Sequence, residues 1–308
     1  MTNKFIVSVD LGGTNLRIAL LNAKYKIRYK EAFSTRRLRK KEDLIAAIIK
    51  SVNKILTARK LHKTDILGMG LGLPGPIDVK RGIVHFFPNI PGWKEVNLKK
   101  ILEKKLRLPV FLDNDANLAA LAEYRLGAAK DTENAVCITL GTGVGGGLII
   151  NGGLYRGLSF AAGEIGHLPI NEKGPQCKCG GIACLETYIG NERIMKEAQR
   201  LFKRNISLEV LSLMAKKRNP KALSVWSGVA RRLGIALTGV VNLLNPDCIV
   251  IGGGVAGAGK VLFDKVKETI AKQAMAVQAK QVKVLKAKLG NDAGLIGAAI
   301  LVKEGIRP

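Results

Sequence analysis

The sequence predicts an α/β protein with two domains, and three observations lead to this prediction. The chain has 308 residues, which is long enough for two domains with separate cores. Hydrophobic residues make up 47% and charged residues 24% of the chain, a globular composition. A unit of strand, glycine turn and strand occurs twice, near residues 12 and 141. We expect domains at 1–118 and 119–292, a hinge near 113–134, and a last helix (293–308) that returns to the first domain.

The first such unit consists of a buried strand at 5–10, a tight turn and a second strand at 16–21. Gly12 and Gly13 would let backbone N–H groups approach an oxyanion, and the Thr14 hydroxyl adds a donor. Asp10, at the end of the strand, is well placed to hold a hydrated magnesium ion. The spacing fits neither the dinucleotide fingerprint nor the P-loop, and an ordinary hairpin turn is the alternative.

Hydrophobic patterns predict a third strand at 25–33 and a strand at 66–73, and an apolar face at helical spacing predicts a helix at 41–59. The stiff Pro-Gly-Pro turn at 74–76 follows and could form one wall of a cleft. In the next loop, Asn89 offers both a donor and an acceptor to a ligand.

A short buried strand at 110–112 runs into the polar segment 113–117, and an alanine-rich helix then continues to about residue 126. Capping that helix requires only one polar side chain, from Asp115 or a neighbour. Four of the five positions are polar, so capping leaves some unexplained. We therefore favour a catalytic role, in which Asp115 beside Asn114 accepts a proton from a substrate hydroxyl.

The second glycine unit consists of a strand at 135–140, a turn at 141–147 and a strand at 148–150. Its Gly141, Thr142 and Gly143 look like the first turn used again, and two facing turns could grip a phosphate chain. Farther along, helices are expected at 186–202, 222–244 and 293–302, and a strand at 248–251 ends in three glycines. Gly253 and Gly254 are then candidates for contact with a nucleotide, although an ordinary crossover turn would look the same.

The segment 163–186 contains one histidine and three cysteines, namely His167, Cys177, Cys179 and Cys184. Four such ligands are the number that closes a tetrahedral structural zinc site. An odd number of clustered cysteines disfavours a disulfide framework. The remaining alternative is a loop of reduced cysteines without metal.

Two carboxylates flank this cluster, Glu164 before the histidine and Glu186 after the last cysteine. A metal bound there would hold both at fixed positions, and rigid carboxylate acceptors suit neighbouring hydroxyls of a sugar ring. Taken singly, either residue also fits a solvated surface charge.

The chain carries a net charge of +26 and has a pI of about 10.1, and such a basic charge suggests nucleic acid as a partner. The basic residues are spread along the whole length, however, and aromatic residues make up only 5%. This favours a lysine-rich solvated surface that attracts anionic ligands over specific nucleic-acid binding. We find no signal peptide and no membrane span, and we expect a cytoplasmic protein with Cys137 and Cys248 reduced in the cores.

With these residues in view, the whole chain resembles the ROK family of bacterial sugar kinases and repressors, and most of all its glucokinases. The first phosphate loop of the family resembles residues 10–14, its catalytic segment residues 112–117 and its second phosphate loop residues 140–147. The sugar and zinc signature resembles 164–167 and the cysteine run that ends at Glu186. One departure is Ala183, where the family usually has glycine. It affects the expected shape of the local turn but not the ligands.

The resemblance implies the two-domain actin-like ATPase (ribonuclease H-like) fold, with a cleft between the domains that holds a sugar beneath ATP. It implies transfer of phosphate to the 6-hydroxyl of glucose with the help of Mg²⁺, and Asp115 as the base. The side chains that would hold the other hydroxyls are Asn89, Asn114, Glu164, His167 and Glu186. His167 would use one ring nitrogen for zinc and the other for sugar. Family kinases are commonly homodimers or homotetramers.

Three alternatives stay open at this stage. The sugar could be N-acetylglucosamine or N-acetylmannosamine, and the donor could be polyphosphate. The family also contains sugar-responsive repressors with a DNA-binding segment ahead of the phosphate loop. Because the loop begins at Asp10, we expect a kinase and not a regulator.

Overall fold

The structure is a computed structural model, and it describes residues 4–35, 38, 40–87 and 93–306. The chain forms two compact units. The first comprises Met1–Ala122, Arg156–Ala162 and Asn291–Pro308, and the second Glu123–Tyr155 and Gly163–Gly290. The first boundary thus lies four residues beyond the one expected at 118, and the short excursion at 156–162 had not been expected.

The first unit is built on a five-stranded sheet in the order β3-β2-β1-β4-β8. Its strands are β1 (Phe5–Leu11), β2 (Asn15–Asn22), β3 (Ile27–Ser34), β4 (Ile66–Leu73) and β8 (Val110–Asn114). The first three strands pair antiparallel, and β4 and β8 are added in parallel. A small separate sheet holds β5 (Ile77–Asp78), β6 (Ile83–Phe86) and β7 (Lys94–Asn97).

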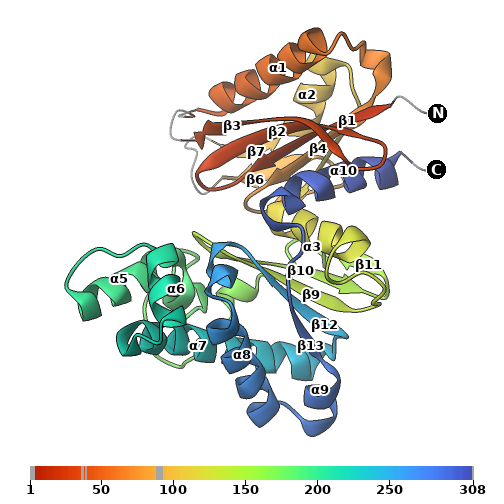
Figure 1. Cartoon of the computed structure of the whole chain (residues 1–308). Helices are drawn as coiled ribbons and strands as arrows, with labels where there is room; N and C mark the ends of the chain where they lie inside the picture. The colour runs from red at the N-terminus through yellow and green to blue at the C-terminus, as the bar shows by residue number, and fades with distance from the viewer. Residues whose placement is uncertain (1–3, 36–37, 39, 88–92, 307–308) are drawn as a thin grey trace. The chain divides into compact units, whose positions relative to one another are not determined.

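Helices cover both faces of the first sheet, because neighbouring residues of a strand point to opposite faces. Val7 and Val9 of β1 belong to the core under α1 (Lys41–Ala58) and α2 (Leu98–Leu106), whereas Ile6 belongs to the core under α10 (Ala293–Gly305). Figure 1 shows α1 and α2 on one side of this sheet and α10 on the other. The remaining elements are η2 (Lys63–Asp65), η5 (Gly290–Asp292) and α3 (Asp115–Leu126), which crosses the unit boundary.

The second unit repeats the sheet topology of the first. Its order is β11-β10-β9-β12-β13, with the first three strands antiparallel and the last two added in parallel. The strands are β9 (Ala135–Leu140), β10 (Val144–Ile150), β11 (Gly153–Tyr155), β12 (Cys248–Gly252) and β13 (Lys283–Lys286). The recurrence of the glycine turn in the sequence therefore reflects a recurrence of the whole sheet arrangement.

The helices of the second unit are α4 (Glu186–Ile189), α5 (Asn191–Phe202), α6 (Leu208–Lys216), α7 (Pro220–Leu244), α8 (Lys260–Gln273) and α9 (Ala276–Gln281), with short 3₁₀ turns η3 (Ile165–His167) and η4 (Gly254–Ala258). α7 starts where sequence rules place a helix start, because the Asn219 side chain accepts a hydrogen bond from Ala222 N at 3.1 Å and Pro220 follows. It packs along α8.

Two sequence expectations for this unit were wrong. The helix expected at 186–202 is two helices, because Gly190 takes an extended conformation (φ −63°, ψ 150°) between α4 and α5. The glycines at 145–147 lie within β10 and not in the turn. A Cβ on Gly146 would stand 2.3 Å from Gly163 O, so the strand needs glycine where a second backbone segment packs on it.

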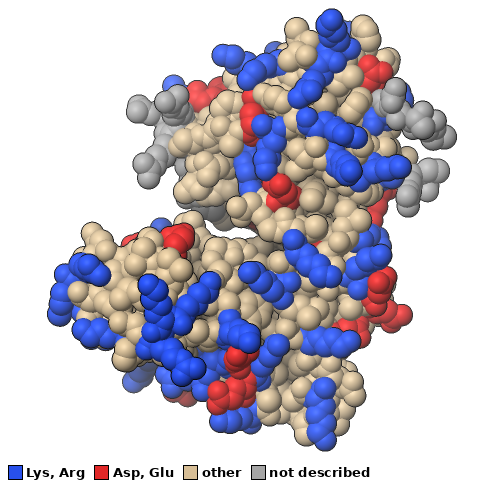
Figure 2. All heavy atoms as spheres, in the orientation of Figure 1, with Lys and Arg blue, Asp and Glu red and all other residues tan. Residues whose placement is uncertain are grey.

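None of the helices in the described part of the chain has the length and apolar character needed to span a membrane. Lysine and arginine side chains are spread over the face drawn in Figure 2 and do not gather in one patch. That distribution matches the spread of basic residues along the sequence.

We predict that Gly70→Ala strongly destabilises the first unit. A Cβ at this position of β4 would lie 2.1 Å from Ala298 O, so α10 would have to move off the sheet. We expect the free energy of unfolding to fall by about 2–3 kcal/mol, measured by urea denaturation. The control is Gly239→Ala on the exposed side of α7, where nothing lies within 4 Å. It should stabilise by about 0.5–1 kcal/mol, and equal losses for both variants would contradict the packing argument.

Candidate active site

In the polar segment 113–117, at the end of β8 and the start of α3, neighbouring side chains make different contacts. Asp113 is 1% exposed and pairs with Arg156, whose Nε and Nη2 lie 2.8 and 2.7 Å from Asp113 Oδ2. Asp113 Oδ1 accepts hydrogen bonds from Asn117 Nδ2 at 3.0 Å and from Asn114 N at 2.8 Å. Asp113 is thus the anchor of the segment and is fully engaged within the protein.

The start of α3 is capped mainly by Asn114. Its Oδ1 accepts hydrogen bonds from Ala116 N at 2.9 Å and from Asn117 N at 3.3 Å. Asp115 is half-buried at the first residue of α3, and its Oδ1 accepts a hydrogen bond from Ala116 N at 2.8 Å. The Asp115 carboxylate thus lies beside the backbone N–H groups of the first turn of α3.

The turn between β1 and β2 presents the first set of backbone donors. Gly12 N donates to Asn15 O at 2.9 Å and closes the turn, while Gly13 and Thr14 are exposed. Thr35 holds the loop from the other side, since its Oγ1 donates to Gly13 O at 3.1 Å. The geometry is that of a hairpin turn with an open surface, so the hairpin and the phosphate-loop interpretations are compatible.

Asp10, predicted to hold magnesium, is only 3% exposed and pairs with Arg17 Nη2 at 2.5 Å. Burial raises the pKa of Asp10, and the charge and hydrogen bond of Arg17 oppose that shift. Any magnesium ion would therefore share this carboxylate with Arg17. Arg17 lies directly opposite Asp10 across the β1–β2 hairpin.

The turn between β9 and β10 is the second glycine turn. Gly141 N donates to Gly143 O at 2.9 Å, and Asn191 N at the start of α5 donates to Gly141 O at 3.0 Å. Thr142 is exposed at its tip. This turn is therefore tied to the α4–α5 region that follows the cysteine cluster.

After β12, the two glycines predicted to contact a nucleotide differ in whether a side chain would fit in their place. Gly253 has φ +81°, and a Cβ there would meet Leu140 O at 2.1 Å, so the crossover itself demands glycine. A Cβ on Gly254 would meet no atom within 4 Å, so this residue borders open space. Packing therefore explains the glycine at position 253 but not the glycine at position 254.

The segment 163–167 lies directly on β10. Gly163 has φ +90°, and a Cβ on Gly166 would meet Val144 O at 2.2 Å. This contact fixes the chain on both sides of Glu164. Burial raises the pKa of Glu164, and the nearby charge of Glu186 adds to the shift while His167 opposes it. The structure thus brings Glu164, His167 and Glu186 together within the second unit.

Glu186 also contacts the second glycine turn. Its Oε2 accepts a hydrogen bond from Val144 N at 2.8 Å, and a Cβ on Gly143 would stand 2.4 Å from the same oxygen. One carboxylate therefore links the start of α4 to the end of the turn. The predicted sugar-binding and phosphate-binding parts of this unit share a hydrogen bond.

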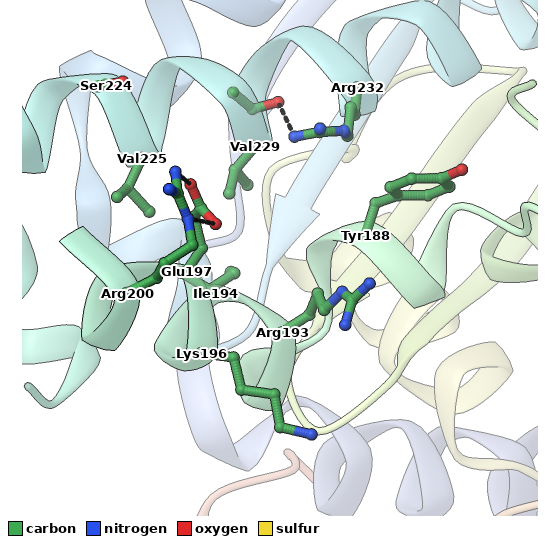
Figure 3. A pocket seen from close by; sticks show the side chains of 11 residues that line it. Tyr188, Arg193, Ile194, Lys196, Glu197, Arg200, Ser224, Val225, Val229 and Arg232 are labelled. Atoms are coloured by element: carbon green, nitrogen blue, oxygen red, sulfur yellow. Dashed lines mark hydrogen bonds and ion pairs between the residues drawn. The ribbon is translucent and has the colours of Figure 1, made fainter. Parts of the chain in front are cut away.

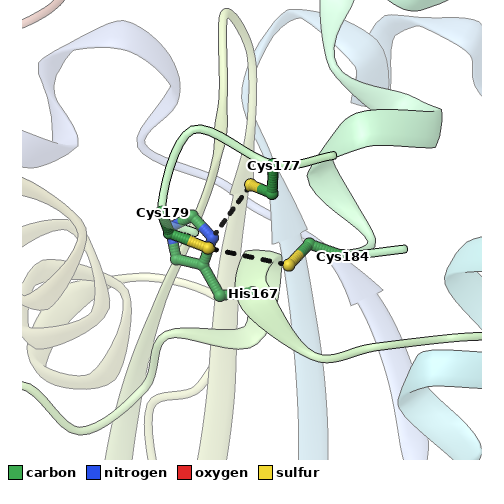
Figure 4. A group of neighbouring side chains, drawn as sticks. All are labelled: His167, Cys177, Cys179 and Cys184. Atoms are coloured by element: carbon green, nitrogen blue, oxygen red, sulfur yellow. Dashed lines mark hydrogen bonds between the residues drawn. The ribbon is translucent and has the colours of Figure 1, made fainter. Parts of the chain in front are cut away.

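The histidine and the three clustered cysteines converge on one point, as Figure 4 shows. Their ligand atoms all lie within 4.8 Å of one another. Cys177 Sγ is 3.7 Å from His167 Nδ1, and Cys179 Sγ is 3.7 Å from Cys184 Sγ. Ligands of a tetrahedral zinc ion stand about 3.8 Å apart, so these two pairs have the spacing of metal ligands. The other ring nitrogen, Nε2, lies 3.8 Å from Glu164 Oε2.

The turn that carries Cys184 forms despite the departure noted in the sequence. Ala183 takes a left-handed conformation with φ +56°, which glycine adopts at lower cost. Its backbone is held on both sides, because Ala183 N donates to Pro175 O at 2.9 Å and Ile170 N donates to Ala183 O at 3.0 Å. The remaining predicted residue, Asn89, lies outside the described part of the chain.

Two arginines that sequence reasoning missed, Arg17 and Arg156, neutralise the buried Asp10 and Asp113. Arg156 reaches Asp113 from the excursion at 156–162, which belongs to the first unit. No local pattern reveals the Asp113–Arg156 pair, whereas Asp10 and Arg17 are opposite each other in the β1–β2 hairpin.

Two α/β units with the same sheet topology, each with a glycine turn between its first two strands, define the class of actin-like ATPase folds. Within that class, the chain belongs to the ROK family, whose family model matches residues 6–305. The chain is 38% identical to a glucokinase of Halalkalibacterium halodurans, with 99% of this chain and 96% of that protein covered.

Solved structures of the family agree with this assignment. A ROK family glucokinase from Streptomyces griseus, in complex with glucose and AMPPNP, is 31% identical with a TM-score of 0.85 and covers 98% of this chain and 100% of its own. A ROK family transcriptional regulator, a homologue of the E. coli MLC protein, is 27% identical with a TM-score of 0.90. That match covers 98% of this chain and 78% of the regulator.

We predict that Cys179→Ser lowers the metal content of the purified protein to a small fraction of one ion per chain. The change removes one of the four candidate ligands, and three ligands hold zinc less tightly than four. Elemental analysis checks this result. The control is Cys248→Ala, a buried cysteine in β12 away from the cluster. Equal metal content in the two variants would argue against this ligand set.

We predict that Arg156→Met lowers the free energy of unfolding by about 3 kcal/mol, because it leaves the buried Asp113 without its counter-charge. Asp113→Asn tests the same pair from the other side. In a double-mutant cycle by chemical denaturation, the combined variant should lose much less than the sum of the single losses. Additive losses would mean that the two side chains are not coupled.

Proposed function

We propose that this chain is a sugar kinase that transfers the γ-phosphoryl group of ATP to the 6-hydroxyl of glucose. The observation that supports this most is the double contact of Glu186. Its carboxylate belongs to the group formed with Glu164 and His167 and also accepts the hydrogen bond of Val144 N beside the second glycine turn. A residue that joins sugar-type acceptors to a phosphate-type loop is what transfer between a sugar and a nucleotide needs.

In this proposal, Asp115 is the general base. It takes the proton from the 6-hydroxyl as that oxygen attacks phosphorus, and it stands at the start of α3. Asn114, Glu164, His167 and Glu186 bind the other hydroxyls, and Asn89 is proposed for the same role. Such contacts align the attacking oxygen, and alignment is the main protein contribution to phosphoryl transfer.

The two glycine turns would bind the phosphates of ATP through backbone N–H groups and through the hydroxyls of Thr14 and Thr142. The exposed residues Gly13, Thr14 and Thr142 suit that task, whereas Gly12 N and Gly141 N close their own turns. Gly253 and Gly254 would lie against the nucleoside. Magnesium bound near Asp10 would neutralise charge on the phosphates. The relatives support ATP as the donor, since the Streptomyces griseus glucokinase was solved with AMPPNP.

The cysteine cluster is proposed to hold zinc with a structural role. His167 would bind zinc through Nδ1, which faces Cys177, and sugar through Nε2 on the side of Glu164. Gly181 N donates to Cys179 Sγ at 3.4 Å, and this backbone contact lowers the pKa of Cys179, whereas burial raises the pKa of Cys184 to about 12. Zinc would then fix the loop between Glu164 and Glu186.

A sugar-responsive regulator is the second candidate. The observation that favours it is the TM-score of 0.90 with the MLC homologue, higher than that of the Streptomyces griseus glucokinase. Among kinases, N-acetylglucosamine, N-acetylmannosamine and polyphosphate remain alternatives for the substrates. We rank the glucokinase first because of the 38% identity to one over nearly the whole chain.

We predict sugar-dependent ADP release with a higher kcat/KM for glucose than for N-acetylglucosamine, N-acetylmannosamine or mannose, and for ATP than for polyphosphate. Asp115→Asn should lower kcat by roughly 10²–10⁴-fold and leave the glucose dissociation constant nearly unchanged. The control is Asp131→Asn, in an exposed turn where φ is +66° and asparagine fits. No ADP release, together with salt-resistant binding to one DNA sequence, would favour the regulator. A near-normal rate in Asp115→Asn would refute the assigned base.

A further inference from the structure

A hollow of about 430 Å³ lies between α5 and α7 of the second unit, with one side formed by Tyr188 of α4. Figure 3 shows the side chains that line it. Its size is within the range of small-molecule sites. Among the residues proposed above for sugar, phosphate or metal binding, none lines it.

Positive charge dominates the lining of this hollow. Four cationic side chains, Arg193, Lys196, Arg200 and Arg232, surround it together with a single carboxylate, Glu197. Arg200 binds that carboxylate in a two-point contact, at 2.9 and 3.1 Å. This hydrogen bonding chiefly lowers the pKa of Glu197, and the charges of Arg232 and Arg193 add to the shift.

The remaining cations are left with little compensation. Lys196 reaches Glu192 at 2.6 Å, outside the hollow. Arg193 makes no side-chain hydrogen bond or ion pair to any residue that the structure describes. Arg232 donates only a long hydrogen bond, at 3.4 Å, to Gly228 O. Among the described residues, two guanidinium groups thus border the hollow without a carboxylate partner at contact distance.

One of these arginines is held in place. The Arg232 guanidinium lies 5.3 Å from the ring centre of Tyr188, within cation–π range. The Tyr188 hydroxyl accepts a hydrogen bond from Asn171 Nδ2 at 3.2 Å, which fixes the ring. The charged face of the hollow therefore includes an oriented guanidinium, which loses less side-chain entropy on binding an anion.

The floor of the hollow is apolar. It is formed by Ile194, Val225 and Val229, each at most 4% exposed. An apolar floor beneath several cations suits a ligand with a compact hydrophobic body and a group of two negative charges. Guanidinium groups bind phosphate oxygens in pairs, so a phosphate monoester matches better than a single carboxylate.

We propose that the hollow between α5 and α7 is a binding site for a small organic phosphate monoester, held by Arg193 and Arg232 over the valine and isoleucine floor. The site is separate from the residues proposed for catalysis. The proposal does not depend on which reaction the protein catalyses.

The test uses phenyl phosphate as the probe, titrated into the full-length protein by isothermal calorimetry at physiological salt. We expect saturable binding of one probe per chain, much weaker binding of inorganic phosphate, and none of phenol. Arg193→Gln and Arg232→Gln should each weaken phenyl phosphate binding by roughly tenfold or more. Arg193 is exposed and Arg232 half-buried, and neither pairs with a described carboxylate at contact distance, so the melting temperature should stay close to that of the wild type.

The matched control is Arg231→Gln, the neighbouring exposed arginine of α7 that does not line the hollow. It removes the same charge and should change the affinity by less than about twofold. Absence of saturable binding would overturn the proposal, and equal losses in all three variants would reduce it to diffuse surface charge. Full displacement of the probe by ATP would also overturn it, because the hollow would then belong to the nucleotide site.

Discussion

The contact on which the candidate site depends is the close packing of segment 163–167 on β10. Backbone meets backbone there, and the glycines at 146, 163 and 166 leave no room for side chains. The segment 163–167 can therefore pack on β10 in only one position, which fixes where Glu164 and His167 lie along the strand. The three cysteines gather near His167 within the same loop, and the hydrogen bond from Val144 N to Glu186 ties its end to the same strand. A site built on a strand in this way is more rigid than one on a free loop.

Much of this arrangement could be predicted from the sequence, for physical reasons. The buried strands are recognisable as apolar runs that end in glycine or in a carboxylate, because a parallel sheet delivers its polar residues at the strand ends. The repeated glycine turn indicated two similar halves, and the structure has the same strand order in both. One histidine and three cysteines within eighteen residues indicated a four-ligand cluster, and the ligand atoms do converge.

The parts that could not be predicted involve partners far apart in sequence or small changes of backbone. Asp113 and Arg156 are 43 residues apart and meet only in the fold. Asp10 and Arg17 lie opposite each other across the β1–β2 hairpin, but a charge in a sequence does not name its partner. Gly190 interrupts a helical pattern that otherwise continues, so propensity alone favoured one helix. The glycines of β10 looked like a turn because their true reason, the approach of Gly163, comes from a distant segment. Asn114 and Asp115 both have cap-forming side chains, and only the hydrogen bonds separate their tasks.

We propose that one metal-fixed loop supplies the acceptors that orient a sugar. Anomalous diffraction at the zinc edge, from crystals grown with glucose, tests it most directly. The account predicts a zinc peak about 2.0–2.3 Å from His167 Nδ1 and the three cysteine sulfurs. It also predicts glucose hydroxyls in hydrogen-bond contact with His167 Nε2 and with the carboxylates of Glu164, Glu186 and Asp115. A zinc peak elsewhere, or a sugar bound away from these groups, would contradict it.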